Sequence, residues 1–434
     1  MWLGPSVSIT TIRGMSDILP DEGGRWQWIE ARARSLFGAF GYDEIRTPIL
    51  ERTELFVRSL GETTDVVEKE MYSFSTASGE SLTLRPEGTA SVVRAYVQHA
   101  LSQRAPANRL YYIGPMYRHE RPQKGRSRQF HQIGAEVIGA ASAEADAEVI
   151  AMLWAFFADV GVEGIQLELS SLGDGVCRPA YLEKLRSFAE TKVGELCENC
   201  TRRRLTNPLR LLDCKVESCK AALAEAPLIS GSLCDPCREH HAGVEAILGE
   251  IGVPYVVNPR IVRGLDYYVR TAFEITTDRL GSQNAVAGGG RYDGLVASFG
   301  GPEAPGVGFA LGVERLLELA GPTPARPAPV FLASHGDAAR RAAIGLAHRL
   351  RLGGMRVETS LDATSLKSQF RRAQRLGASV VMTLGESELA AGTVRAKNMA
   401  TGAEEDWPRE PGSLLERLRA LPPADVTVES RSSV

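Results

Sequence analysis

Apolar residues recur every three or four positions between residues 24 and 40, and this spacing predicts a helix. The apolar positions are Trp26, Ile29, Ala33, Leu36, Phe37 and Phe40. Gly41 follows them and is a typical stop signal. The next segment, DEIRTPILE at 43–51, is expected to form a short strand that carries Pro48. We therefore expect the chain to open with a helix and then a strand.

Strand-like segments joined by polar loops follow through the first 320 residues. They are LTLRPEGTA (82–90), RLYYIGPMYR (109–118), RQFHQIGAEVIG (128–139), IQLELSSLG (165–173) and YYVRTAFEITT (267–277). A glycine-rich stretch, AVAGGGRYDGLV (285–296), comes next, and PGVGFALGVERLLELA (305–320) is expected to turn from strand into helix. Strands in succession with helices outside them indicate an antiparallel sheet in an α+β fold.

The strand predicted at 128–137 has two different faces, because side chains alternate along a strand. One face carries His131, Ile133, Ala135 and Val137 and is expected to pack against a helix. The other carries Phe130, Gln132, Gly134 and Glu136. A glycine gap between an amide and a carboxylate could seat a small polar ligand on this second face.

The domain organisation follows from changes in composition. Residues 176–254 hold all seven cysteines and helix-like segments, so we expect an inserted, mainly helical module. It would interrupt a larger domain made of residues 1–175 and 255–322. Four prolines at 321–330 predict a linker. Alternating strands and helices then predict a three-layer α/β domain at 323–420, and a polar tail at 421–434 is expected to be disordered.

Composition and charge narrow the class of protein. The chain has 434 residues, of which 44% are hydrophobic and 24% charged, as in a protein that buries a core. The net charge of −3 argues against nucleic-acid binding by bulk positive charge, but local basic patches remain open. No signal peptide and no apolar run long enough to cross a bilayer are recognised. We expect a cytoplasmic protein without membrane contact, whose cysteines do not form structural disulfides.

A basic cluster precedes and enters the two-faced strand. Arg118, Arg121, Lys124, Arg126 and Arg128 lie within eleven positions. Guanidinium groups bind phosphate through paired hydrogen bonds, so the hairpin could hold a phosphorylated ligand beside a small polar one. The pattern alone fits a solvated hairpin tip equally well.

Five segments, in order along the chain, resemble the histidyl-tRNA synthetase family. YRHERPQKGRSRQFHQ (117–132) resembles the second signature motif of class II aminoacyl-tRNA synthetases. The other four are TLRPEGTA (83–90), similar to the amino-acid loop, VRGLDYYVRTAFE (262–274) and GGGRYDGL (288–295), similar to the histidine-specific motifs, and GVGFALGVERL (306–316), similar to the third class II motif. The helix at 24–40 with DEIRTPILE resembles the first motif, which builds the dimer interface in this class. The C-terminal domain resembles the anticodon-binding module.

The resemblance implies a histidine–tRNA ligase. Such an enzyme is a homodimer that uses ATP and Mg²⁺ to ligate L-histidine to tRNA(His). The histidine carboxylate attacks the α-phosphate of ATP, and the terminal ribose of the tRNA then attacks the histidyl-adenylate. Because the first step joins an anion to a polyanion, the site needs positive charge where the phosphate builds up negative charge.

The resemblance also assigns the residues that bind ATP. Arg118 would hold the α-phosphate and the substrate carboxylate, and Arg126 would reach the triphosphate tail. Glu120 would accept a hydrogen bond from the adenine amino group, Phe130 would stack under the adenine, and Arg315 would cover the nucleotide. Arg263 and Arg118 are the expected catalytic residues. Arg263 would lie at the α-phosphate, unless an ion pair with Asp266 occupies it instead.

The histidine site is assigned in the same way. Glu87, Gly88, Thr89 and Gln132 belong to the set around the substrate ammonium, in which Glu87, Thr89 and Gln132 act as acceptors. Glu136 and the Tyr268 hydroxyl would bind the imidazole, with Tyr267 lining the pocket. Arg118 and Arg263 complete the set, together with Tyr292, which would close the pocket or serve as a core tyrosine. Arg121 and Gln123 are expected to face the acceptor end of the tRNA.

Two other functions keep the same fold. One is a non-catalytic, synthetase-like, histidine-binding regulatory subunit of histidine biosynthesis. Such proteins usually lack the C-terminal domain and degrade the ATP-binding arginines. The other is an ATP-dependent ligase that does not use tRNA.

The cysteines have no role in the resemblance. CENC places Cys197 and Cys200 in one CxxC pair, and CDPC places Cys234 and Cys237 in another. Two such pairs are typical of a tetrahedral zinc site, which leads to the hypothesis of one structural Zn²⁺ on these four thiolates. Cys214 and Cys219 could replace one pair, and free thiols are the alternative to any metal. The zinc would hold the module near the tRNA acceptor stem, through the basic run TRRR at 201–204.

Overall fold

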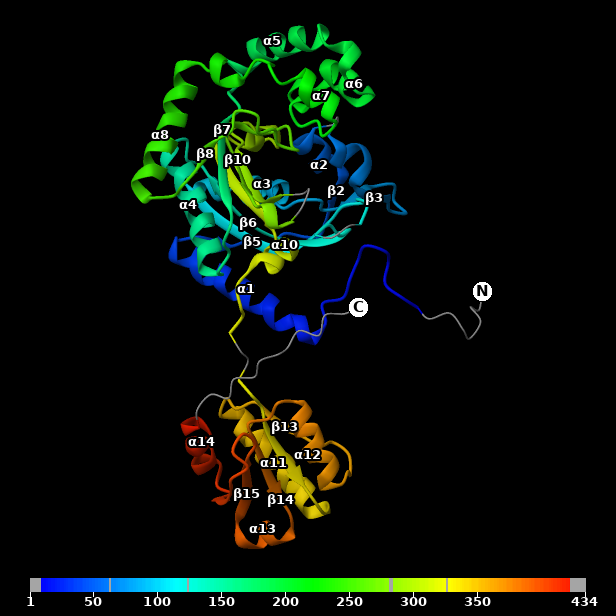
Figure 1. Ribbon diagram of the computed structural model, residues 1–434, viewed down its shortest axis with the longest axis vertical. Coiled ribbons are helices and arrows are strands. Elements are labelled where there is room, and N and C mark those ends of the chain that lie inside the picture. The colour runs from blue at the N-terminus through cyan, green and yellow to red at the C-terminus, as the bar shows by residue number, and fades with distance from the viewer. Residues whose placement is uncertain (1–8, 62–63, 123–124, 281–283, 325–326, 422–434) are drawn as a thin grey trace. The chain divides into compact units, whose positions relative to one another are not determined.

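The computed structural model describes residues 9–61, 64–122, 125–280, 284–324 and 327–421. The chain divides into two compact units between Pro322 and Thr323. Each unit has its own hydrophobic core, so each is described by itself (Figure 1).

The first unit is built on an eight-stranded sheet. The strands, in spatial order, are β1 (Asp43–Glu44), β5 (Asn108–Tyr117), β6 (Gln129–Ile138), β11 (Gly306–Gly312), β10 (Ala285–Arg291), β9 (Val269–Thr276), β7 (Gln166–Ser171) and β8 (Val256–Val257). The six central strands are antiparallel, and the two edge strands, β1 and β8, pair in parallel with their neighbours. The predicted antiparallel sheet is therefore confirmed.

One face of this sheet is covered by four helices. They are α1 (Pro20–Ala39), α4 (Ala143–Asp159), α8 (Asp235–Ile251) and α10 (Val313–Leu319). The apolar face of β6 packs against them through Ile133, Ala135 and Val137, as its alternation predicts. In α1 the buried residues are Ile29, Ala33 and Phe37, so the helical spacing points the expected positions inward. Pro20 at the first turn suits the start of a helix, because its missing N–H has no partner there.

The opposite face packs against α3 (Thr89–Gln98) and α9 (Leu295–Ser298). Two sequence expectations fail on this side. The segment 82–90 is a strand only in β4 (Ser81–Leu84), and Thr89 already begins α3. The segment 43–51 splits into β1 and β2 (Leu50–Arg52), and Pro48, which cannot donate a ladder hydrogen bond, lies in the break. Together β2, β4 and β3 (Tyr72–Ser75) form a separate small sheet.

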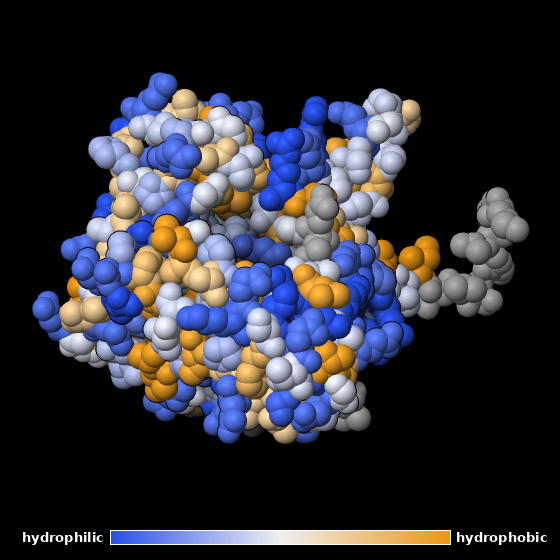
Figure 2. All heavy atoms as spheres, turned by 90° about the horizontal axis from the view of Figure 1, so that it is seen from above, coloured by the Kyte–Doolittle hydropathy of each residue, from blue (hydrophilic) through white to orange (hydrophobic). Residues whose placement is uncertain are grey.

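A helical module connects β7 to β8. In order it contains α5 (Arg178–Glu190), α6 (Glu198–Thr206), α7 (Glu217–Ala222) and α8, with short 3-10 turns between them. Helices α5, α6 and α7 lie above one end of the sheet in Figure 1, and α8 runs down beside the sheet. Seen from above, hydrophilic and hydrophobic side chains are interspersed on this surface without one broad hydrophobic area (Figure 2).

The basic run 201–204 pairs with carboxylates of the same chain. Arg202 lies 3.8 Å from Glu68, and Arg203 lies 3.3 Å from Asp65. Arg204 lies 2.6 Å from Glu190. The first two pairs join α6 to the turn at Val66–Glu70, so these arginines attach the module to the rest of the unit. These contacts do not favour the expectation that the run faces tRNA.

A buried ionic cluster joins the sheet to two helices behind it. Arg291, at the end of β10, is fully buried and pairs with Asp146 of α4. The Nε2 atom of His240, on α8, lies 2.7 Å from the same carboxylate. Burial alone would raise the pKa of Asp146, but the His240 hydrogen bond and the Arg291 charge hold it below its usual value. This cluster fixes the last helix of the module against the catalytic sheet.

The second unit is a three-layer domain. Its five-stranded sheet has the order β13 (Val357–Thr359), β12 (Val330–Ser334), β14 (Val380–Leu384), β15 (Thr393–Asn398) and β16 (Glu404–Pro408). Helices α11 (Asp337–Leu352) and α14 (Pro411–Ala420) share one core with it, and α12 (Leu366–Arg375) lies beside the other. Strands β13, β12 and β14 are parallel, whereas β15 and β16 pair antiparallel, so the α/β sheet is mixed.

The remaining expectations concern the ends of the chain and the membrane. Residues 422–434, almost the whole predicted tail, lie outside the described residues. Across the described ranges, no helix combines the length and apolar character needed to span a bilayer.

Candidate active site

A cavity of about 250 Å³ opens on the sheet face that carries α3. It is lined from β6, β10, β11, the start of α10, the loop after β5 and the loop before β9. Four arginines of the described residues line it: Arg118, Arg126, Arg263 and Arg315. The structure thus brings together arginines from three segments that lie at least 50 residues apart in the sequence.

Arg263 lies flat on a glycine of the central sheet. A Cβ on Gly288 would lie 2.4 Å from its Nη1 atom, so only glycine leaves room for the guanidinium. The group stands 5.6 Å from the centre of the Tyr268 ring and forms an ion pair with Glu274. The alternative pairing with Asp266 is not formed, because Asp266 accepts a hydrogen bond from Asn207. The Nε atom of Arg263 is buried and has no hydrogen-bond partner among the described residues, which leaves a donor for a ligand.

Arg118 and Arg126 both lie in the loop that joins β5 to β6, and both line the cavity. The Arg118 guanidinium lies 5.3 Å from the centre of the Phe130 ring, and its Nε donates to the Pro86 carbonyl. Arg126 pairs with Glu120 at 2.8 Å. In this structure Arg118 lies over the ring expected to carry the adenine, and Arg126 binds the carboxylate expected to accept from it. A nucleotide in the expected pose would therefore exchange these contacts for its own.

Arg315 closes the cavity from α10. Its Nε donates to the Gly125 carbonyl at 3.1 Å and its Nη1 to the Ala285 carbonyl. Burial lowers its pKa from the ordinary value, and the nearby Arg126 acts in the same direction. Two cations held this close favour a polyanion between them.

The Glu87 carboxylate caps α3. It accepts hydrogen bonds from the backbone N–H groups of Thr89, at 2.6 Å, and Ala90, at 2.9 Å. This satisfies donors at the start of the helix that would otherwise be unpaired. Glu87 and Thr89 both line the cavity. Since burial raises the pKa of Glu87, a positively charged ligand group nearby would favour its ionised form.

Glu136 lies beneath the cavity and not on its wall. It is fully buried. It accepts hydrogen bonds from the Thr89 hydroxyl at 2.7 Å and the Tyr292 hydroxyl at 2.6 Å. Burial raises the pKa of Glu136 to about 8. Tyr292 is itself buried, so it supports Glu136 from below, and the interpretation as a core tyrosine describes its position.

The glycine gap on the polar face of β6 is filled by the chain itself. A Cβ on Gly134 would lie 2.3 Å from the Tyr112 ring, and one on Gly88 equally close. Tyr112 therefore occupies the space at Gly134, and the part of this face that lines the cavity is Phe130 and Gln132. The buried Tyr112 hydroxyl has no hydrogen-bond partner among the described residues. This tyrosine had no place in the sequence-based assignment.

The remaining expected histidine ligands surround the same space. Gln132, Tyr267 and Tyr268 all line the cavity. The Oε1 atom of Gln132 is buried and unpartnered within the described ranges. The Tyr267 and Tyr268 rings lie 4.6 Å apart. The site thus offers polar atoms that a small polar ligand could satisfy.

Two features outside the cavity also bear on the predicted site. Arg121 is exposed after β5, whereas Gln123 lies outside the described residues. The four cysteines proposed as one metal site do not come together. Cys197 and Cys200 lie with Cys214 and Cys219, while Cys234 and Cys237 lie with Cys177 and Asp174. The hypothesis paired the two CxxC segments with each other, which these positions contradict. The alternative in which Cys214 and Cys219 replace one pair agrees with the first group, whereas the grouping of Cys177 and Asp174 with the second pair was not predicted.

Three supporting residues were not assigned a role from the sequence. Glu274 pairs with Arg263 because it lies opposite Gly288 in the β9–β10 register. Arg178, the first residue of α5, donates to the Tyr268 carbonyl at 2.6 Å. Glu314 accepts from the His131 N–H at 2.9 Å and so ties α10 to β6. None of these pairings is visible as a local pattern.

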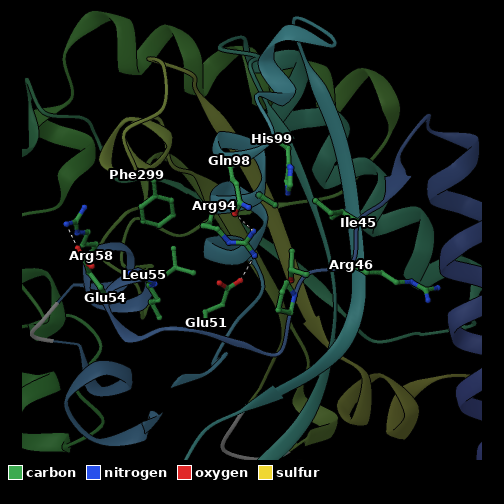
Figure 3. Close-up of a pocket in the computed structure, with 14 residues that line it drawn as sticks. Ile45, Arg46, Glu51, Glu54, Leu55, Arg58, Arg94, Gln98, His99 and Phe299 are labelled. Carbon is green, nitrogen blue, oxygen red and sulfur yellow. Dashed lines mark hydrogen bonds and ion pairs between the residues drawn. The ribbon is translucent and has the colours of Figure 1, made fainter. Parts of the chain in front are cut away.

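A larger cavity of about 630 Å³ lies elsewhere, between the loop after β1, β2, α2 (Thr53–Leu60) and α3. Figure 3 shows Arg94 at its centre between Glu51 and Gln98, with Arg58 and Glu54 paired at one side. Its lining includes Ile45, Arg46, Thr47, Pro48 and Glu51, which belong to the segment 43–51 that resembles part of the first class II motif. It contains none of the predicted substrate-binding residues.

Comparisons with known proteins agree with the geometry. Residues 14–316 match the family described as Histidyl-tRNA synthetase, and residues 330–419 match the Anticodon binding domain. The chain is 50% identical to Histidine--tRNA ligase of Syntrophotalea carbinolica, over 95% of this chain and 100% of that one. It is 52% identical to the protein of that name in Trichlorobacter lovleyi, over 92% and 96% of the two chains.

A solved structure is also similar. Apo histidyl-tRNA synthetase of S. aureus has a TM-score of 0.79 and 36% identity, with 94% of this chain and 99% of that one covered. The fold, the cavity with its four arginines and these matches together place the chain in the histidyl-tRNA synthetase family, within the class II aminoacyl-tRNA synthetases.

Proposed function

We propose that the protein ligates L-histidine to tRNA(His) in two steps at the 250 Å³ cavity. A histidine carboxylate oxygen bonds to the α-phosphorus of ATP, and the bond to the bridging oxygen breaks to release pyrophosphate. A hydroxyl of the terminal tRNA ribose then attacks the histidyl carbonyl, and AMP leaves. The observation that carries the proposal is the convergence of four arginines on a cavity that also contains acceptors for an ammonium group.

Arg263 and Arg118 are the proposed catalytic residues. Negative charge grows on the α-phosphate as the new bond forms, and a fixed cation stabilises that charge without having to reorganise. Arg263 suits this task because its plane is set by Gly288, Tyr268 and Glu274. Arg126 and Arg315 are proposed to hold the remaining phosphates.

Magnesium is proposed to enter as the ATP complex. Glu87, Glu120 and Glu314 line the cavity, and each already has a partner in the chain. Mg²⁺ in nucleotide sites is commonly held by substrate phosphates and water with few protein carboxylates. These residues therefore fit a phosphate-bound ion better than a dedicated protein cage.

Histidine is proposed to bind with its ammonium near Glu87, Thr89 and Gln132, and with its imidazole near Glu136 and Tyr268. A site whose buried polar groups need partners rejects substrates that lack them, by about 10⁴–10⁵ in favourable cases. The depth of Glu136 is consistent with this role, since Thr89 and Tyr292 already orient its carboxyl. Selectivity would then arise in the synthetic site without an editing domain.

Replacing Glu136 with alanine tests the histidine site. The Michaelis constant for histidine is expected to rise by about 10-fold or more, because the lost acceptor leaves an imidazole N–H unpaired in the complex, at about 1–3 kcal/mol. The Michaelis constant for ATP is expected to change little. Both constants are measured by histidine-dependent pyrophosphate exchange.

Glu136→Gln is the matched control, because it keeps the shape and an acceptor oxygen but cannot ionise. It should fall between the wild type and Glu136→Ala in its histidine Michaelis constant. An unchanged constant in both variants would remove Glu136 from the histidine site.

The C-terminal unit is proposed to bind the anticodon arm. A chain that ends at Pro324 is expected to keep pyrophosphate exchange, because the first unit has its own core and contains the whole cavity. Its tRNA charging should fall by about 10²-fold at low tRNA concentration, as expected when one of two linked contacts is lost.

The comparison is between full-length and shortened chains, each assayed for exchange and for charging over a range of tRNA concentrations. Raising the tRNA concentration should recover part of the loss. Full charging at low tRNA would assign the C-terminal unit a different role.

Two further parts of the proposal concern partners. Arg121 is proposed to contact the acceptor end of the tRNA, where an arginine can bind phosphates and base edges.

The chain is proposed to form a homodimer through the surface around the 630 Å³ cavity in Figure 3. Ile49 and Leu50, which lie in the segment 43–51 beside this cavity, are each about 40% exposed. Sedimentation of wild type and Leu50→Arg tests this, since a charge there should favour the monomer.

The regulatory-subunit alternative is separated by the same assay. Such a protein would bind histidine without exchanging pyrophosphate into ATP. The four arginines and the C-terminal unit are both present, and they have no evident use in a protein that only senses histidine. Histidine-dependent exchange, followed by charging of tRNA, supports the ligase, and binding without exchange supports the alternative.

A further inference from the structure

All seven cysteines of the chain fall into two compact clusters within and beside the helical module. The first contains Cys197, Cys200, Cys214 and Cys219, and the second contains Cys177, Cys234 and Cys237 together with Asp174. Every cysteine is a free thiol. In each cluster the four ligand atoms lie within 4.8 Å of one another.

The first cluster has the dimensions of a tetrahedral thiolate site. The Sγ atoms of Cys197 and Cys214 are 3.9 Å apart. Four sulfurs at about 2.3 Å from a zinc ion would be about 3.8 Å from one another. The Cys197 backbone N–H also donates to Cys219 Sγ at 3.0 Å, a contact that stabilises sulfur when it carries negative charge. An iron–sulfur cluster would need its cysteine sulfurs farther apart, so the spacing suits a single ion.

The second cluster repeats the arrangement with one carboxylate. Cys177 and Cys237 have their Sγ atoms 3.9 Å apart. The Oδ1 atom of Asp174 lies 3.6 Å from Cys177 Sγ and 3.8 Å from Cys234 Sγ. Its position is fixed by the Val176 N–H at 3.0 Å, and its other oxygen faces Arg270 at 3.5 Å. Three thiolates and one carboxylate oxygen are an acceptable zinc ligand set.

Ordinary core packing does not account for these groups. Five of the thirteen buried residues in the core of the module are cysteines. Asp174 also places Oδ1 within 3.8 Å of two thiols, a contact between possible metal ligands that apolar packing does not require. Small domains with little apolar surface are often stabilised by a metal or a disulfide. The module has no disulfide. Of these two ways to stabilise a small domain, a bound metal is the one that remains.

We propose that the module binds two structural zinc ions, one on Cys197, Cys200, Cys214 and Cys219 and one on Asp174, Cys177, Cys234 and Cys237. Each ion joins segments that lie apart in the sequence. The first joins the start of α6 to the turns around α7, and the second joins the end of β7 to the starts of α5 and α8.

Both ions would also support the loop that carries the proposed catalytic arginine. Next to Cys177, Arg178 donates to the Tyr268 carbonyl at 2.6 Å. Just after α6, Asn207 donates to Asp266 at 3.0 Å, and Arg210 donates to the Gly264 carbonyl at 2.7 Å. The zinc sites therefore hold the residues that bind the 263–268 loop from outside the cavity. This second consequence rests on the proposed function, whereas the metal sites themselves do not.

Metal analysis of the full chain, purified without added chelator, tests the sites. Two equivalents of zinc per chain are expected for the wild type. Cys214→Ser and Asp174→Ala should each retain one equivalent, because each variant damages a different site. Asp213→Asn is the matched control, since this carboxylate adjoins Cys214 but belongs to neither cluster, and it should retain two.

A second measurement avoids dependence on the folding of the variants. Wild-type protein reconstituted with Co²⁺ alone should show intense tetrahedral d–d bands and sulfur-to-metal charge transfer that saturate at two equivalents. Less than a tenth of an equivalent of zinc, with all seven thiols reacting under native conditions and no cobalt spectrum, would overturn the proposal. Saturation at one equivalent would overturn the pair of sites.

The link to the loop has its own readout. Zinc removal is expected to raise the Michaelis constant for histidine in pyrophosphate exchange by several-fold, with recovery when Zn²⁺ alone is returned. An unchanged constant in metal-free protein would refute the link while leaving the metal count intact. Absence of exchange in the zinc-loaded protein would instead contradict the proposed function.

Discussion

Arg263→Ala is expected to lower histidine-dependent pyrophosphate exchange by about 10³-fold while the chain remains folded. The guanidinium is proposed to face the α-phosphate, and the loss of one preorganised donor at a developing charge typically costs about 10²–10³ in rate. Loss of a whole cation should lie at the upper end. Folding should change little, because Arg263 has one ionic partner, Glu274, which keeps access to solvent.

Two companions make this result specific. Arg263→Lys keeps the charge but loses the planar fork, so it should also be severely impaired. Glu274→Gln keeps the arginine and removes only its ion pair, so it should lose far less activity. Exchange is measured with saturating ATP and histidine, and thermal unfolding reports the fold. Near-normal exchange in Arg263→Ala would exclude the residue from catalysis.

Asp146→Ala is expected to lower the free energy of unfolding of the first unit by about 3–5 kcal/mol, the range for breaking a buried ion pair from one side. The substitution would leave the buried Arg291 with Asp293 as its remaining carboxylate partner among the described residues, and it would remove the partner of His240. The effect should be on stability, because the cluster lies behind the sheet and none of its members lines the cavity. Urea and thermal unfolding of the full chain measure it.

The double variant Asp146→Leu with Arg291→Met is the informative control. Replacing both charges with apolar groups of similar size is often neutral or stabilising, so much of the lost stability should return. If Asp146→Ala lowered the free energy of unfolding by less than about 1 kcal/mol, the Asp146–Arg291 ion pair would not contribute importantly to the packing of β10 against α4.

Much of the first unit could be predicted because its information is local. The two faces of β6 follow from a period of two, and Ile133, Ala135 and Val137 face the helices as expected. The turn from β11 into α10 follows in the same way from one continuous segment. The arginines of the cavity came from resemblance to family motifs, since no spacing rule places Arg118 beside Arg263.

The features that were missed depend on contacts between distant segments. Arg263 pairs with Glu274 because the β9–β10 register sets that glutamate opposite Gly288. Tyr112 fills the space above Gly134 because β5 and β6 are neighbours. The cysteines divide as they do because Asp174 and Cys177, at the end of β7, meet Cys234 and Cys237 at the start of α8. Local CxxC spacing identifies metal ligands but not which of them share an ion.

The central sheet also determines how the chain must fold during synthesis. Strand β6 lies between β5 and β11 in the sheet. Strands β6 and β11 are separated by roughly 170 residues of sequence. At about 5–20 residues per second, the ribosome needs on the order of ten to thirty seconds to produce that interval. Throughout this time the nascent chain exposes one hydrogen-bonding edge of β6. Pairing over such a separation is slow, so newly made N-terminal segments should depend on chaperones until β11 emerges.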